Sequence, residues 1–193
     1  LIVCGDENVK VDPGVPTPVS GQYAVASLNA AVRDLKDGKI DVLVTCPINK
    51  KNTQGYDFGF IGHTEYLAAQ FGDDQPLMFM VSEALKVGLV TMHIPLKEVP
   101  AAVTTENVLH QIRSIKRSLE RDFGLVGPKI AVLGLNPHAG DEGLLGNEEQ
   151  EIIVPALQSA KYENITAIGP FAADGFFGSA GYTRFDAILA MYH

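Results

Sequence analysis

Short apolar runs recur along the chain, and most of them lack the polar alternation of a strand with one wet face. The runs cover residues 1–4, 40–44, 77–81, 87–92, 130–135, 167–169 and 187–191. Uninterrupted apolar runs of this length, ended by turn-forming residues, are typical of strands buried on both faces. We therefore predict a strand at each run.

Segments with helical spacing separate these runs. In residues 22–36 apolar side chains recur at intervals of four, three and four, and Asp37-Gly38 ends the pattern. The longest helix is predicted over residues 104–123, with Thr104 or Thr105 as its cap. Shorter helices are predicted at 64–71 and at 148–161, and the buried stripe of the longest one consists of Val108, Ile112, Ile115 and Leu119.

Strands that alternate with helical segments of 10 to 20 residues indicate an α/β protein. The expected architecture has three layers, α/β/α, with helices on both faces of a mostly parallel sheet. The chain begins with Leu1 rather than Met and ends inside an apolar run at His193, so we expect it to be an internal part of a longer protein.

Composition excludes several classes of protein. The chain is 46% apolar and 20% charged, which is enough to bury a core. Its net charge of -8, without a Lys/Arg cluster, argues against a nucleic-acid partner. No apolar run approaches the roughly 20 residues that span a membrane. The two cysteines form no CxxC pair and no signal peptide is recognisable, so we expect a cytoplasmic protein without disulfides.

Three histidines occupy similar places. His93, His138 and His193 each lie at or just after the end of an apolar run. Ligands of open α/β sheets bind outside the carboxyl ends of the strands, and three imidazoles there could hold a divalent ion. Their intervals of 45 and 55 residues match no short metal motif. The alternative, that each histidine is a strand-end residue bonded to a nearby carbonyl, stays open.

The segment Gly62-His63-Thr64-Glu65 precedes the predicted helix at 64–71. With Thr64 as the N-cap, the free N–H groups of the first turn would suit a phosphate, and His63 could add a donor. An ordinary capping motif without a ligand explains the same residues.

Two further places could carry chemistry. The loop 136–143 is rich in glycine but is neither a Walker A loop nor a GxGxxG motif. Asp174 follows the run at 167–169, where a carboxylate could act as a base or orient a metal ligand, although such an Asp is more often a turn former. Cys46 has no identifiable catalytic partner.

Five motifs occur in one order along the chain: Thr45-Cys46-Pro47-Ile48-Asn49-Lys50, Gly62-His63-Thr64-Glu65-Tyr66-Leu67-Ala68, Asn136-Pro137-His138-Ala139-Gly140 with Gly143, Gly146, Glu148 and Glu149, Gly169-Pro170 with Ala173-Asp174, and Ala190-Met191-Tyr192-His193. In this set the chain resembles the 4-hydroxythreonine-4-phosphate dehydrogenases of the vitamin B6 pathway. The resemblance implies NAD- or NADP-dependent oxidation of 4-phosphooxy-L-threonine, followed by decarboxylation to 3-amino-2-oxopropyl phosphate.

The resemblance also implies a fold like that of the isocitrate and isopropylmalate dehydrogenases, with two lobes and the site in the cleft. Residues 1–58 would be the remainder of the terminal lobe, and residues 59–193 a central lobe truncated at its end. His93, His138 and His193 fall on the family's metal positions, for Zn, Mg, Mn or Co, and His63 and Thr64 fall on substrate positions. The family forms homodimers whose site is shared between subunits.

The family's pattern continues after His193 with Asp-Gln-Gly and with Lys, Asn and Arg residues that bind substrate. We therefore expect this piece alone to be inactive. Three alternatives stay open: a paralogue that oxidises 4-phospho-erythronate or 4-phospho-threonate, a phosphate acyltransferase of similar fold, and a remnant that only dimerises.

Overall fold

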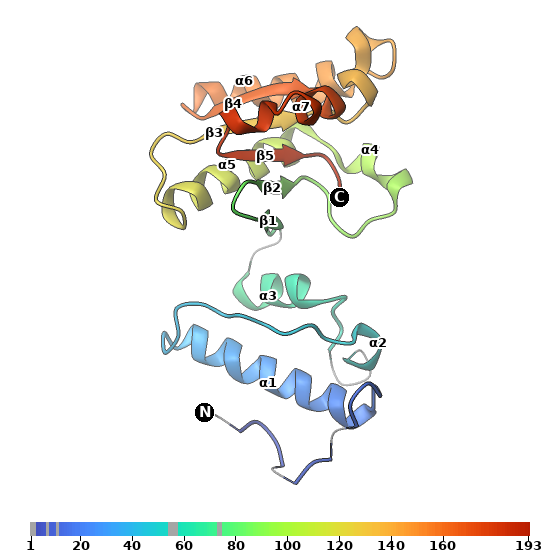
Figure 1. The fold of residues 1–193 in the computed structure, drawn as a ribbon, viewed down its shortest axis with the longest axis vertical. Helices are drawn as coiled ribbons and strands as arrows, with labels where there is room; N and C mark the ends of the chain where they lie inside the picture. Colours follow the sequence, from blue (N-terminus) through green and yellow to red (C-terminus); the bar gives the residue numbers. More distant parts are fainter. Residues whose placement is uncertain (1–2, 7, 11, 54–57, 73–74) are drawn as a thin grey trace. The chain divides into compact units, whose positions relative to one another are not determined.

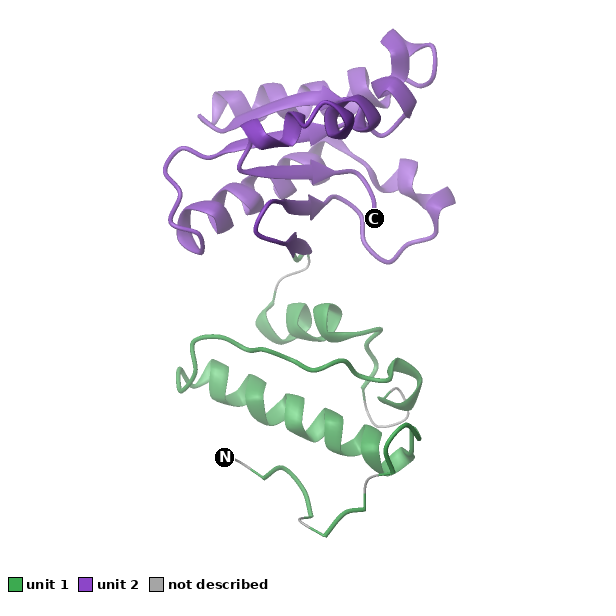
Figure 2. Ribbon diagram, viewed as in Figure 1, with its two compact units in different colours: residues 1–76 green, residues 77–193 purple. Residues whose placement is uncertain are grey.

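The computed structural model describes residues 3–6, 8–10, 12–53, 58–72 and 75–193. The chain divides into two compact units, Leu1–Pro76 and Leu77–His193, which are coloured separately in Figure 2. The predicted lobe boundary after residue 58 does not coincide with this division. The rings of Phe58 and Tyr66 pack against each other with centroids 5.1 Å apart, so residues on both sides of that boundary pack within the first unit.

The first unit contains α1 (Pro18–Lys36), α2 (Lys50–Thr53) and α3 (His63–Phe71) (Figure 1). Helix α1 begins at Pro18, earlier than the predicted start at residue 22. Thr17 and Ser20 form a reciprocal capping box, in which the Ser20 N–H donates to Thr17 Oγ1 at 3.2 Å. The proline suggests a loop from sequence, but at the first helical position its missing N–H costs nothing.

Two strands are predicted in the first unit, and none of the residues of that unit that the structure describes belongs to a strand. Residues 40–44 lie outside any helix or strand, and Val42 and Val44 are 73% and 90% exposed. An apolar run becomes a strand only where a second strand satisfies its backbone groups, and no described segment pairs with this run. The other predicted strand covers residues 1–4. Residues 1 and 2 lie outside the described residues, and Val3 and Cys4 belong to no strand.

The second unit is built on a five-stranded sheet in the order β1-β2-β5-β3-β4 (Figure 1). Strand β1 pairs antiparallel with β2, whereas β2, β5, β3 and β4 run parallel. The mostly parallel sheet is therefore confirmed. The strands are β1 (Phe79–Val81), β2 (Lys86–Leu89), β3 (Lys129–Leu133), β4 (Thr166–Phe171) and β5 (Ala187–Ala190).

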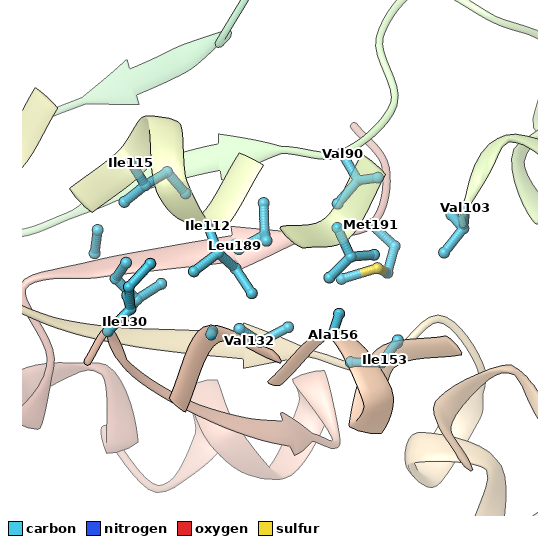
Figure 3. Close-up of a cluster of buried hydrophobic side chains, with 14 of the residues drawn as sticks. Val90, Val103, Ile112, Ile115, Ile130, Val132, Ile153, Ala156, Leu189 and Met191 are labelled. Carbon is cyan, nitrogen blue, oxygen red and sulfur yellow. The ribbon is translucent and has the colours of Figure 1, made fainter. Parts of the chain in front are cut away.

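Helices cover both faces of this sheet, so the three-layer architecture is confirmed. One face packs against α5 (Thr105–Arg121) and α6 (Val154–Tyr162), with Ile130, Val132 and Leu189 in the shared core shown in Figure 3. The other face packs against α7 (Ala173–Gly178) through Phe176. The remaining elements are η1 (Leu96–Glu98), α4 (Val99–Ala102), η2 (Pro137–Gly143), η3 (Glu149–Ile153) and η4 (Gly181–Arg184).

Helix α5 forms as its sequence predicts. Thr104 caps it by accepting a hydrogen bond from the Asn107 N–H at 3.1 Å. The four residues of its predicted stripe are all 0% exposed: Val108, Ile112, Ile115 and Leu119. Burying an aliphatic side chain stabilises a fold by about 1.5–3 kcal/mol, so this stripe anchors the helix to the sheet. Across the described ranges, no helix is both long and apolar enough to cross a membrane.

Candidate functional site

The carboxyl ends of four parallel strands lie side by side at one edge of the sheet in the second unit. His93 follows β2, His193 follows β5, His138 follows β3 and Asp174 follows β4. Because β5 lies between β2 and β3, the order along this edge is His93, His193, His138 and Asp174. The predicted placement of each residue after a strand is confirmed, and this edge is where open α/β sheets bind ligands.

His93 and His193 are brought together by an extension of the β2–β5 pairing. The Thr91 N–H and the Thr91 hydroxyl both donate to the Met191 carbonyl, at 3.1 and 2.8 Å. Thr91 is buried, so these bonds are shielded from water. Both histidines line one small pocket of about 110 Å³, together with Tyr192.

His138 and Asp174 line a second and larger pocket, of about 470 Å³, at the ends of β3, β4 and β5. His138 Nδ1 lies 3.8 Å from Asp174 Oδ2, and the two side chains are 65% and 70% exposed. Tyr192 belongs to the walls of both pockets, so they adjoin at the end of β5. The edge thus presents imidazole and carboxylate groups to solvent in two neighbouring hollows.

Imidazole donors suit a divalent transition metal such as zinc. Among the described residues of one chain, however, no three His, Cys, Asp or Glu side chains stand close enough together to hold an ion. The structure brings the predicted metal ligands to one sheet edge and places two of them on one pocket. The three-histidine metal site itself stays a prediction.

Glu149 is a residue of this edge that sequence reasoning did not assign. Its side chain is buried, at 2% exposure, and its Oε1 accepts hydrogen bonds from the N–H groups of Leu135 and Asn136, both at 2.7 Å. Burial raises the pKa of Glu149, but the hydrogen bonds, chiefly those from Asn136, outweigh burial and hold the pKa below its ordinary value of 4.5. The carboxylate is therefore stable in its charged form, next to the loop that carries His138.

The first unit contains the other predicted site residues, at the start of α3. The N-cap of α3 is Gly62, and no side chain caps it, so the prediction of Thr64 as the cap is wrong. His63 and Thr64 are instead the first two residues of the helix, whose N–H groups have no partner within a helix. These groups and the helix dipole favour an anion.

Lys50 lies close to this helix start, which the sequence did not reveal. A side-chain carbon added at Gly62 would be 3.8 Å from Lys50 Nζ and 3.4 Å from Glu65 Oε2. A cation and a carboxylate therefore both stand beside the helix start. His63 also lines a pocket of about 320 Å³ with residues 45–48, which include the exposed Cys46.

Comparison with known proteins matches residues 3–193 to the family model of the pyridoxal phosphate biosynthetic protein PdxA. The chain is 47% identical over 194 residues to a 4-hydroxythreonine-4-phosphate dehydrogenase of Bacteroides thetaiotaomicron, covering all of this chain and 53% of that protein. The chain thus spans about half the length of the curated relatives it matches.

Solved structures of related enzymes have the same fold as this chain. A 4-hydroxythreonine-4-phosphate dehydrogenase of Klebsiella pneumoniae superposes with a TM-score of 0.85 at 31% identity, over 95% of this chain and 55% of that one. A terephthalate 1,2-cis-dihydrodiol dehydrogenase of Burkholderia xenovorans superposes with a TM-score of 0.71 at 25% identity, over 95% and 58%. By the match over nearly its whole length, this chain belongs to the PdxA family of pyridoxal phosphate biosynthetic proteins.

Proposed function

We propose that the protein oxidises 4-phosphooxy-L-threonine with NAD or NADP and that the product loses carbon dioxide to give 3-amino-2-oxopropyl phosphate, a step of pyridoxine 5'-phosphate formation. Membership of the PdxA family and the names of its relatives support this reaction. The nicotinamide would take up the hydride.

The observation that carries the proposal is the row of His93, His193, His138 and Asp174 at the carboxyl edge of four parallel strands. His93, His138 and His193 would hold a divalent ion such as Zn, Mg, Mn or Co. When bound, the ion would polarise the alcohol oxygen of the substrate and ease the loss of its proton. Asp174, beside His138, would orient that imidazole or accept a proton.

The start of α3 would bind the phosphate of the substrate. The N–H groups of His63 and Thr64 present partial positive charge, and Lys50 adds a full positive charge near Gly62. Glu65 opposes this charge in part. A phosphorylated small molecule is therefore the ligand class that this helix start favours.

We further propose that the active protein is a homodimer whose site is shared between subunits. Of the three proposed metal ligands, His93 and His193 line one pocket and His138 lines the next. A second copy that brings its own histidine to this edge would complete a three-ligand site, consistent with the lack of a three-ligand group within the described part of one chain.

The test is the reduction of NAD or NADP by the full-length protein with 4-phosphooxy-L-threonine, before and after removal of metal with a chelator. We expect turnover that is lost with the metal and restored by a divalent ion. If the protein oxidises 4-phospho-erythronate or 4-phospho-threonate but not 4-phosphooxy-L-threonine, it is a paralogue with a different substrate. Acyl transfer to phosphate without any need for metal would contradict the dehydrogenase.

A further inference from the structure

The loop that carries His138 has an unusual backbone. Six consecutive residues, from His138 to Gly143, have positive φ, with values from 44° to 99°. Only Gly140 and Gly143 among them are glycines. The left-handed conformation costs an L-residue about 1–2 kcal/mol, so a run of this length persists only if the surrounding structure holds it.

The carboxylate of Glu149 accepts hydrogen bonds at the start of this loop. Besides the two backbone N–H groups that donate to its Oε1, the Asn136 side-chain amide donates to its Oε2 at 3.0 Å. The same amide donates to Glu148 Oε2 at 2.7 Å. Three donors from the strand-to-loop junction of β3 therefore converge on one buried carboxylate, immediately before His138.

The loop also closes tightly over this carboxylate. A side-chain carbon at Gly140 would lie 2.6 Å from Glu149 Oε2, and one at Gly134 would lie 3.0 Å from Glu149 Oε1. Contacts this short exclude any larger residue at Gly140, whose φ of 82° also favours glycine. The backbone on both sides of His138 is thus packed against Glu149.

We infer that Glu149 is a positioning residue for the proposed metal site: its buried carboxylate sets the left-handed loop and thereby fixes the backbone of His138 beside Asp174. This inference rests on the proposed function, because it gives Glu149 a role only if His138 binds the metal. Glu149 acts through Leu135, Asn136 and the loop, and none of the hydrogen bonds described for its carboxylate involves His138 itself. A ligand must be held to within about 0.5 Å for effective coordination, which a freely moving loop cannot do.

The experiment compares two substitutions in the full-length protein with a matched control. Glu149→Ala removes every acceptor, whereas Glu149→Gln keeps one oxygen and places a second donor against the Asn136 amide. Glu151→Gln removes one charge from the same η3 segment at an exposed position. The measurements are the affinity for Zn²⁺ or Co²⁺ by chelator competition and the hydrogen exchange of the Leu135 and Asn136 amides without metal.

We expect both Glu149 variants to exchange these two amides faster and to bind the metal at least tenfold more weakly, with the larger loss in Glu149→Ala. Glu151→Gln should match the wild type in both measurements. If Glu149→Ala does not fold, Glu149→Gln decides the question. Faster exchange with metal affinity within twofold of the wild type would overturn the inference, as would unchanged exchange.

His138→Ala separates this inference from the proposed function. If His138→Ala leaves metal affinity unchanged, His138 is not a ligand, and the proposed metal site fails together with the role of Glu149. If His138→Ala lowers the metal affinity but the Glu149 variants do not, the metal site stands and only the inference about Glu149 fails.

Discussion

His138 Nδ1 lies 3.8 Å from Asp174 Oδ2, although the two residues follow different strands. His138 follows β3 and Asp174 follows β4, and the parallel pairing of these strands places their carboxyl ends together. Both side chains are exposed, so the pair by itself contributes little to stability. A carboxylate beside a metal-ligating imidazole orients its ring, which is the role we expect for Asp174.

We predict that Asp174→Asn weakens divalent metal binding by about tenfold or more, because outer carboxylates of metal-binding histidines contribute effects of about 10–100-fold. Chelator competition on the full-length protein measures this loss. Asp41→Asn, at an exposed position of the other unit, is the control and should leave the affinity unchanged. An Asp174 variant with wild-type affinity but reduced turnover would favour a role as a proton acceptor instead.

We predict that His63→Ala lowers kcat/KM for the phosphorylated substrate by at least tenfold, or about 1.4 kcal/mol. His63 opens α3, where the helix start favours a phosphate. Steady-state rates of the full-length wild type and variant, measured over a range of substrate concentrations, give the two kcat/KM values to compare. Kinetics equal to the wild type would remove His63 from the substrate site.

We predict that Ile112→Ala lowers the free energy of unfolding by about 2–5 kcal/mol, because the side chain is fully buried and its removal leaves a cavity. Ile112 packs between α5 and the sheet (Figure 3). Urea denaturation followed by circular dichroism provides the measurement. Val126→Ala is the control, since Val126 is 99% exposed and should change stability by less than about 0.5 kcal/mol.

We predict that ionisation of Glu149 contributes to the pH dependence of the free energy of unfolding. Its pKa in the folded protein is lowered, despite burial, by hydrogen bonds from Asn136 and Leu135, so its ionised form stabilises the fold. This contribution is complete above the unfolded pKa near 4.5 and is lost as the pH falls through the lower folded pKa. The stability difference between wild type and Glu149→Gln should therefore be largest near neutral pH and shrink below pH 4.5. A stability difference between wild type and Glu149→Gln that stays constant from pH 7 to pH 3 would contradict this prediction.

The local sequence pattern was sufficient to predict those helices and strands whose signals lie within their own segment. Helix α5 has its cap and its whole buried stripe within one segment, so sequence predicts both correctly. The strands of the second unit were predictable for the same reason, since each is a short apolar run. Residues 40–44 show the limit, because pairing depends on a neighbour that no local pattern contains.

The sequence by itself determined that His93, His138, His193 and Asp174 each follow a strand, and its motifs indicated the family. Only the tertiary structure decided their order along the sheet edge, because β5 inserts between β2 and β3 and so places His193 between His93 and His138. Tertiary structure also brought Glu149 to the His138 loop and Lys50 to the start of α3. These contacts join residues whose separation along the chain carries no periodic signal, and they form only when the sheet and its covering helices pack.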